Sequence, residues 1–185
     1  MALKEIEIET GRLRLRLFRP DDLEELCRIW GDPEVTRFIN GGKPFPLERI
    51  ESFIPLSREM WRQNGFGQLA VVEKDSGRVI GYCGFKFLEE TPEVELLYGL
   101  AKDRWNQGLI TEAARACLRF AFAETKLRRI VAIAQHANKG SYRVMEKLGM
   151  KFEKEAHCYH MDVLYYAISR DEFRPDGSAY ILRAD

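Results

Sequence analysis

The sequence lacks the features that would hold the protein in a membrane or send it out of the cell. No apolar run approaches the roughly 18 consecutive residues that a membrane-spanning helix needs, and the densest one, IVAIA, covers residues 130–134. The opening residues MALKEIEIET alternate acidic with apolar side chains. They have neither the basic start nor the apolar core of a secretory signal. We therefore expect a cytoplasmic protein with no membrane partner.

The chain also lacks an excess of charge of either sign. Its 29 basic and 29 acidic side chains cancel, so no long-range positive field would draw the protein to nucleic acid or to an anionic membrane. We expect no nucleic-acid partner. With 185 residues, the chain has the length of one domain. The sequence therefore predicts a single domain over residues 1–185.

Metal-binding and redox patterns are missing as well. The cysteines lie far apart and form no CxxC pair, and the histidines have no carboxylate or cysteine companions at metal-ligand spacing. We expect reduced thiols and no bound metal. The residues concerned are Cys27, Cys83, Cys117, Cys158, His136, His157 and His160.

The first part of the chain predicts one strand followed by two helices. Residues 12–18, RLRLRLF, alternate basic and apolar side chains with the period of a half-buried strand. The acidic pair at 21–22 then marks the start of a helix that ends near Gly31. Residues 31–46 are rich in glycine and proline and predict a loop, and a second helix begins at Leu47.

The rest of the chain predicts an antiparallel meander and then a parallel crossover. Three strand-like segments with turn signals between them favour antiparallel pairing. A helix from Thr111 leads into the apolar strand 128–134, which indicates a parallel crossover. A helix ended by Gly149 and one or two closing strands follow, so the order indicates an α/β (α+β) fold. The three strand-like segments are residues 68–74, 78–88 and 94–100.

The segment with the most chemical information is LAKDRWNQGLITEA, residues 100–113, where a strand ends in a loop that becomes a helix. The first turn of a helix has unpaired N–H groups and the positive end of the dipole, so such a loop can bind a pyrophosphate. Gly108 would let the backbone approach phosphate closely. The alternative is that Gly108 only turns the chain. No GKS or GKT follows, which excludes a P-loop, and the three glycines of a Rossmann fingerprint are absent.

Three segments together resemble a known family. ELLYGLAKDRWNQGLITEA resembles the acetyl-CoA-binding segment of GNAT N-acetyltransferases, especially of the RimJ/RimL-like branch that acetylates ribosomal-protein alanines. NKGSYRVMEKLGMKF resembles the second segment of that branch, and ETGRLRLRLFRPDDLEELCRIWGDPEVTRFI its opening strand and helix. The resemblance extends from about Glu9 to about Arg170. It implies a mixed, splayed sheet of six to seven strands with about four helices, and acetyl-CoA as cosubstrate.

The resemblance also implies roles for individual residues. The loop from Trp105 to Ile110 would offer backbone N–H groups to the pyrophosphate, and the N–H near Leu100 would polarise the thioester carbonyl. The chain departs from the family at Asn106, where glycine is frequent, and at Ile110, where glycine or alanine is preferred. The residues carried over to cofactor binding are Leu100, Trp105, Asn106, Gln107, Gly108, Leu109, Ile110, Thr111, Asn138 and Ser141.

Two side chains are candidates for catalysis. An alkyl amine has a pKa of about 10, so attack on a thioester needs a base, and Glu95 is the candidate. The alternative is an exposed strand glutamate. Ser141 could donate a proton to the departing thiolate, or it could simply cap a helix. Met145 stands where the family often has a proton-donating tyrosine, and Glu112 is interpreted as an acid that complements the helix dipole.

The function implied is transfer of an acetyl group from acetyl-CoA to a primary amine of a protein N-terminus or small molecule, by direct attack. The alternative is a CoA-binding sensor or scaffold of the same fold with little catalytic activity. The protein would be a monomer or homodimer. Candidate acceptor-pocket residues are Trp30, Phe38, Trp61, His157 and Asp162.

Overall fold

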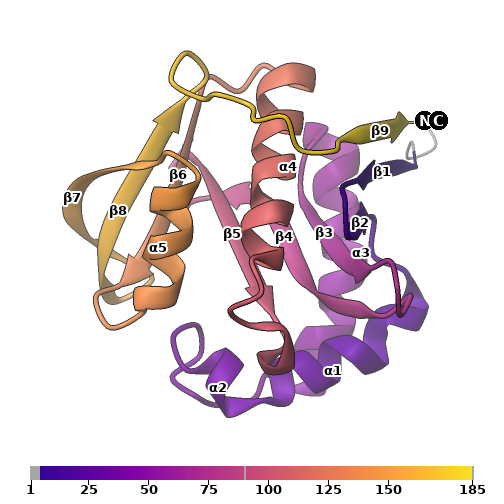
Figure 1. The fold of residues 1–185 in the computed structure, drawn as a ribbon. Coiled ribbons are helices and arrows are strands. Elements are labelled where there is room, and N and C mark those ends of the chain that lie inside the picture. The colour runs from indigo at the N-terminus through magenta and orange to yellow at the C-terminus, as the bar shows by residue number, and fades with distance from the viewer. Residues whose placement is uncertain (1–4, 90, 185) are drawn as a thin grey trace.

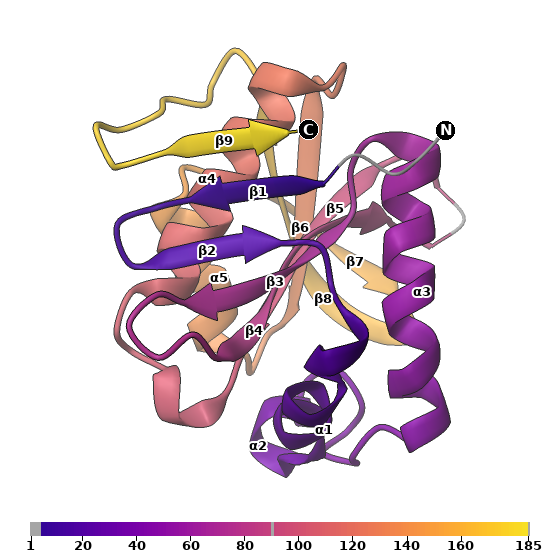
Figure 2. The ribbon, with the colours of Figure 1, turned by 90° about the vertical axis from the view of Figure 1, so that its right-hand side faces the viewer.

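The computed structural model describes residues 5–89 and 91–184, which form one mixed sheet with helices on both of its faces (Figures 1 and 2). Within these residues the sheet has nine strands in the order β7-β8-β6-β5-β4-β3-β2-β1-β9. The strands are β1 Ile6–Glu9, β2 Leu13–Arg16, β3 Gln68–Glu73, β4 Val79–Phe87, β5 Val94–Leu100, β6 Arg129–Gln135, β7 Lys151–Cys158, β8 Met161–Ser169 and β9 Ile181–Ala184. The α-helices are α1 Leu23–Gly31, α2 Pro33–Thr36, α3 Leu47–Asn64, α4 Leu109–Glu124 and α5 Lys139–Lys147. Short 3-10 helices cover Pro20–Asp22 and Lys102–Arg104.

The α/β class and the mixed sheet are confirmed, and the element counts differ from the prediction at short elements. The prediction gave six to seven strands and about four helices, whereas the described residues contain nine strands and five α-helices. The strand β9 follows an irregular segment and pairs with β1. The helix α2 lies inside the stretch predicted as a loop, because the Asp32 side chain accepts a hydrogen bond from the Glu34 N–H and Pro33 occupies the first turn.

The buried apolar residues form three clusters, and the two that meet at β3 lie on opposite faces of the sheet because strand side chains alternate. In β3, Leu69 and Val71 join the core that includes α4, whereas Ala70 and Val72 join the core that includes α1 and the first part of α3. Figure 2 shows α4 and α5 on one side of the sheet and α1 and α3 on the other. Among the described residues, no helix has both the length and the apolar character that crossing a membrane would take.

The sheet changes direction between β5 and β6. The pairing of β4 with β5 is antiparallel and extends from Val94 to Leu100 on β5. The pairing of β5 with β6 is parallel and registers Glu95 opposite Val131. Because a parallel neighbour needs a crossover, α4 lies between them in sequence and begins beside the end of β5 (Figure 1). The two strands diverge beyond Glu95, and this splay places the candidate site.

Candidate active site

A cavity of about 480 Å³ lies between the helices at the start of the chain and the splayed strands β5 and β6. Its helix-side wall is largely aromatic, and its sheet-side wall has most of the polar groups. The lining residues are Trp30, Phe38, Ile39, Phe45, Arg49, Phe53, Gln68, Tyr82, Lys86, Glu95, Leu96, Leu97, Tyr98, Ile133, Ala134, Gln135, Asn138, Ser141, Met145, Tyr159, Met161 and Val163.

Glu95 is a buried carboxylate on the cavity wall, with 6% of its surface exposed. Its Oε2 lies 3.5 Å from Lys86 Nζ and accepts a hydrogen bond of 3.1 Å from the Tyr159 hydroxyl. Lys86 Nζ also lies 4.2 Å from the centroid of the Tyr159 ring. Burial raises the pKa of Glu95, and Lys86 and Tyr159 offset part of that rise. Glu95 is therefore not an exposed strand residue, and its catalytic role stays a prediction.

Ser141 and Asn138 reach the same cavity from the start of α5. The Asn138 side chain caps the helix by accepting a hydrogen bond of 3.3 Å from the Ser141 N–H. The capping role considered for Ser141 thus belongs to Asn138. The Tyr98 hydroxyl donates to the Ser141 carbonyl oxygen at 2.9 Å and lies 3.3 Å from Ser141 Oγ. Burial raises the pKa of Tyr98, so its hydroxyl stays protonated at neutral pH.

The loop between β5 and α4 has two residues in the left-handed region, and none of its residues lines the cavity. Asn106 and Gly108 have positive φ angles of 61° and 76°. Asparagine tolerates this conformation better than most residues, which explains how Asn106 can stand where the family often has glycine. Gly108 is the N-cap of α4, so the free N–H groups of the first turn follow it directly. Ile110 packs against the apolar core, which accounts for its branched side chain.

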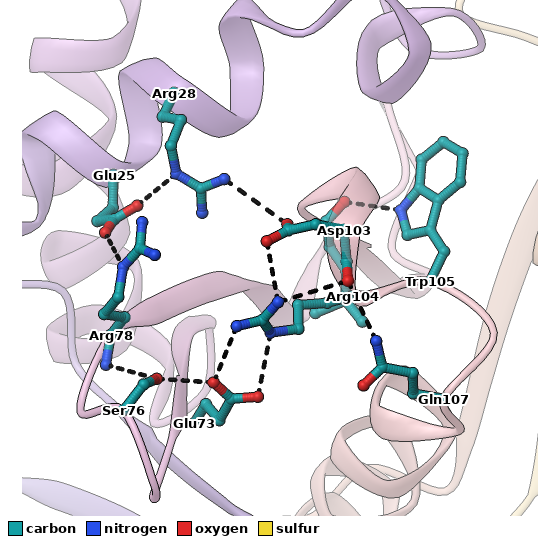
Figure 3. Close-up of polar contacts among 10 residues, drawn as sticks. Glu25, Arg28, Glu73, Ser76, Arg78, Asp103, Arg104, Trp105 and Gln107 are labelled. Carbon is teal, nitrogen blue, oxygen red and sulfur yellow. Dashed lines mark hydrogen bonds and ion pairs between the residues drawn. The ribbon is translucent and has the colours of Figure 1, made fainter.

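Side-chain hydrogen bonds hold this loop in shape. The Trp105 indole N–H donates to the Leu100 carbonyl at 2.9 Å, and the Gln107 side-chain amide donates to the Asp103 carbonyl at 3.1 Å. Leu100 is the last residue of β5, and its carbonyl oxygen already accepts the hydrogen bond from Trp105. These contacts link the end of the strand to the start of α4 (Figure 3).

An ionic network fixes the base of the loop to the turn between β3 and β4. Arg104 donates to both carboxylate oxygens of Glu73, at 3.1 and 3.3 Å, and pairs with Asp103 at 2.9 Å. Ser76 donates to Glu73 at 2.7 Å. The pKa of Glu73 is lowered, mainly by the hydrogen bond from Ser76 and next by the hydrogen bond from Arg104.

The network continues to α1. Arg28 lies 3.7 Å from Asp103 and 2.7 Å from Glu25, and Glu25 also accepts a hydrogen bond of 2.8 Å from Arg78. Figure 3 shows these side chains as a chain of contacts from α1 across the β3–β4 turn to the loop. The loop before α4 is thus connected to two other elements that are distant in sequence.

Glu112 has a structural position, as the sequence interpretation assumed. Its carboxylate accepts hydrogen bonds from the Thr10 hydroxyl at 2.6 Å and from the Arg12 backbone N–H at 2.9 Å. Arg12 also donates to the Gln107 carbonyl at 2.9 Å. Burial alone would raise the pKa of Glu112, but the hydrogen bonds from Thr10 and Arg12 lower it below its usual value. The start of α4 is thereby attached to the turn between β1 and β2.

The structure brings some of the candidate acceptor residues to the cavity and leaves others away from it. Trp30 and Phe38 line the cavity. Trp61 donates its indole N–H to the Gln68 carbonyl at 3.0 Å and packs against Phe120. His157 and Asp162 pair with each other at 2.8 Å, and both side chains are exposed. Trp61, His157 and Asp162 are not among the lining residues.

Sequence reasoning did not single out several residues that line the cavity. Lys86 and Tyr159 contact Glu95, and Tyr98 contacts Ser141. Strand alternation would place Tyr98 on the face opposite Glu95, yet both residues line the cavity. Tyr159 lies in the turn between β7 and β8 and has a positive φ of 50°. Its approach to Glu95, far earlier in the chain, follows from the tertiary fold and leaves no local signal.

Within the part of the chain that the structure describes, no group of three or more His, Cys, Asp or Glu side chains is arranged to hold a metal ion. The four cysteines are free thiols. The polar chemistry of the cavity therefore consists of a carboxylate, an ammonium, a guanidinium, hydroxyls and amides. Such groups can bind, orient and exchange protons with a substrate.

Comparison with known proteins gives one consistent result. Residues 12–151 match the family described as the acetyltransferase (GNAT) domain. The chain is 31% identical over 179 residues to the uncharacterized N-acetyltransferase YnaD of Bacillus subtilis, and the alignment covers 91% of this chain and 99% of YnaD. A GNAT-family acetyltransferase from Bacillus anthracis has a similar crystal structure, with a TM-score of 0.77, 29% identity and coverage of 90% of this chain and 99% of that one.

A third similar protein is the ribosomal-protein-S5-alanine acetyltransferase of Vibrio fischeri. Its crystal structure matches with a TM-score of 0.69, and the alignment covers 91% of this chain and 99% of that one. At 19% identity, this likeness concerns the fold.

Proposed function

Because the chain belongs to the GNAT acetyltransferase family, we propose that it transfers the acetyl group of acetyl-CoA to a primary amine by direct attack. The suspected family and the N-acetyltransferase activity are confirmed. We propose that the acceptor amine is that of a protein N-terminus or a small molecule. One observation carries the mechanism: Glu95, Asn138 and Ser141 lie on the wall of one cavity where β5 and β6 diverge. We propose that the chain works as a single cytoplasmic domain, as a monomer or homodimer.

The residues at the loop fit a cofactor with phosphate groups. The N-cap Gly108 has a left-handed conformation, which favours glycine at this position. Backbone N–H groups from Trp105 to Thr111 would hold the pyrophosphate at the positive end of the α4 dipole. Acetyl-CoA supplies the acetyl group as an activated thioester. Asn138 and Ser141 would contact the pantetheine end in the cavity.

Glu95 would accept the proton of the attacking amine, directly or through a water molecule. A protonated amine has no free electron pair, and its pKa of about 10 keeps it protonated at neutral pH. Burial raises the pKa of Glu95, which makes the carboxylate a stronger base than an exposed glutamate. The hydrogen bond from Tyr159 and the ion pair with Lys86 orient its Oε2.

Ser141 would donate a proton to the sulfur that leaves. Its Oγ lies 3.3 Å from the Tyr98 hydroxyl, so Tyr98 could return a proton to Ser141 or supply one itself. The thioether of Met145, which is buried and lines the cavity, has no proton to donate. The two hydroxyls would therefore act as proton donors in place of the tyrosine that the family often has where this chain has Met145.

Two measurements on the purified protein test the proposal. Saturating acetyl-CoA or CoA should raise the melting temperature, because a ligand that binds the native state stabilises it. Release of free thiol from acetyl-CoA should then depend on an added amine, with peptide N-termini, amino acids, polyamines and aminoglycosides as candidates. Stabilisation without thiol release across these acceptors would favour the sensor or scaffold. If neither acetyl-CoA nor CoA changes the melting curve, the proposal is wrong.

A further inference from the structure

The helix-side wall of the cavity contains an arginine without a counterion. Arg49 lies in the first turn of α3, and its guanidinium carbon is 4.4 Å from the centroid of the Phe45 ring. Within residues 5–89 and 91–184, no carboxylate pairs with the Arg49 side chain. The other cation of the cavity wall, Lys86, has Glu95 as its partner at 3.5 Å. The wall thus has two cations and one carboxylate, which leaves one positive charge in excess.

Aromatic packing restricts the position of this guanidinium. Phe45 packs edge-on against Trp30 with 5.6 Å between ring centroids, and Trp30 packs against Phe53 at 4.7 Å. A guanidinium stacked on a ring keeps its N–H edges free, and these edges match the two oxygens of a carboxylate. Arg49, which is exposed, therefore offers an oriented anion-binding group beside an apolar surface on the wall of the proposed active site.

From this arrangement we infer that the acceptor is a small amine that also carries an anionic group, such as an amino acid with an apolar side chain. Arg49 binds the anionic group, the rings of Phe45 and Trp30 contact the apolar part, and the amine lies toward Glu95. A polyamine or aminoglycoside would instead bring more positive charge to a wall that already has an excess. This inference rests on the proposed function, because it names the acceptor class of that same site.

The experiment compares acceptors that differ in one group. Phenylalanine, phenylalaninamide and phenethylamine share the ring and the amine, but only phenylalanine has a carboxylate; a phosphonate analogue tests a second anion. Rates are corrected for the fraction of free amine. The wild-type kcat/KM for the anionic acceptors should exceed that for the other two by about tenfold or more, the range expected for hydrogen bonds to a charged group. Arg49→Gln should remove most of this preference, and Arg49→Lys should restore part of it.

Arg37→Gln is the matched control. Arg37 is also exposed, and its guanidinium carbon lies 5.2 Å from the centroid of the Phe38 ring, but Arg37 does not line the cavity. This variant should keep the wild-type preference. Calorimetric binding of phenylalanine in the presence of CoA gives a readout without turnover: Arg49→Gln should weaken it about tenfold, and Arg37→Gln should leave it unchanged.

Three results would overturn the inference about the acceptor. Each of them can be distinguished from a result that overturns the proposed function. In the first, Arg49→Gln weakens acetyl-CoA binding and leaves acceptor preference intact, so Arg49 serves the cofactor. In the second, the wild type prefers neutral or cationic amines while still transferring acetyl groups, which leaves the proposed function in place. In the third, phenylalanine binds the wild type and Arg49→Gln equally. Loss of the proposed function itself appears separately, as absence of stabilisation by acetyl-CoA and CoA.

Discussion

The two sides of the proposed active site are held by different forces. The loop before α4, which would bind the cofactor, is fixed by an ionic network around Arg104, Asp103 and Glu73 (Figure 3). The helix-side wall of the cavity is fixed by ring packing around Trp30, and Gln135 adds a polar contact because its amide donates to the Phe38 carbonyl at 3.0 Å.

The difference indicates how each side can serve its ligand. Hydrogen bonds and ion pairs have preferred directions, so they fix the loop backbone in one conformation. A fixed backbone is what N–H donors need in order to point at a phosphate group. Ring packing is less directional, so a side chain can be exchanged on the aromatic wall with less effect on its neighbours. We expect substitutions on the loop side to change cofactor affinity and substitutions on the cavity side to change turnover or acceptor choice.

Among the substitutions that test this comparison, we expect the largest loss of activity at Glu95. Glu95→Gln keeps the size of the side chain and removes the basic oxygen, so kcat should fall by about 10²-fold with little change in acetyl-CoA affinity. The rate should recover as the pH approaches about 10, where free amine is abundant. Glu93→Gln is the control, since Glu93 pairs with Arg129 at 3.2 Å and does not line the cavity. Wild-type kcat at pH 7 with rate-limiting chemistry would make Glu95 a structural residue.

A smaller effect is expected at Ser141, which lines the cavity. Ser141→Ala should lower kcat by about tenfold, because a thiolate is a fair leaving group and water can also supply a proton. Steady-state kinetics and acetyl-CoA titration of the same protein separate kcat from affinity. Tyr98→Phe tests the neighbouring hydroxyl, and if it lowers kcat more than Ser141→Ala does, Tyr98 is the main proton donor.

The loop side can be tested at Arg104. Arg104→Gln removes the contacts with Glu73 and Asp103, so the Kd for acetyl-CoA should rise by about fivefold, a modest change because partly exposed ion pairs contribute little. Acceptor KM should remain near the wild-type value. The gap in Kd between variant and wild type should shrink with added salt. Arg62→Gln, which breaks an exposed pair with Glu59 on α3, should leave Kd unchanged; an equal rise there would show a nonspecific charge effect.

The smallest effect is expected from Tyr159→Phe and concerns pH. The Tyr159 hydrogen bond lowers the pKa of Glu95 against the effect of burial, so its loss should raise that pKa further. Glu95 acts as a base only when deprotonated, and the acid limb of the kcat/KM profile should therefore move to higher pH. The variant should lose rate below neutral pH and match the wild type at high pH. An unchanged acid limb would mean that this limb reports another group.

The sequence predicted the elements with strong periodicity and the loop with a special backbone. The alternation around Leu13 and Leu15 predicted a strand, and both side chains are buried there. Gly108 predicted a turn before α4, and the structure has this turn with Gly108 in the left-handed region. The short strands β1 and β9 were not predicted, since four-residue segments carry little periodicity and β9 forms through pairing with a distant partner.

The candidate site was predictable only in part, because its groups come from separate segments. Glu95 and Ser141 could be named by resemblance, and the structure places both at one cavity. Lys86 and Tyr159 could not be named, because their contacts with Glu95 depend on how β4 and the β7–β8 turn approach β5. Arg49 differs from other surface arginines through its stacking on Phe45 and its place in the cavity wall, and neither feature has a local sequence signal.

The pairing of β9 with β1 has a practical consequence for handling the protein. Ile6 lies opposite Ala184, so the two ends of the described chain are neighbours at one margin of the sheet (Figure 1). In the strand order, β9 is five positions from β5, which corresponds to about 24 Å at the usual spacing between strands. A biotin tag or a fused fluorescent protein attached at either end would therefore anchor the molecule to a sensor chip by the margin remote from the cavity and leave substrates free access from the bulk solution.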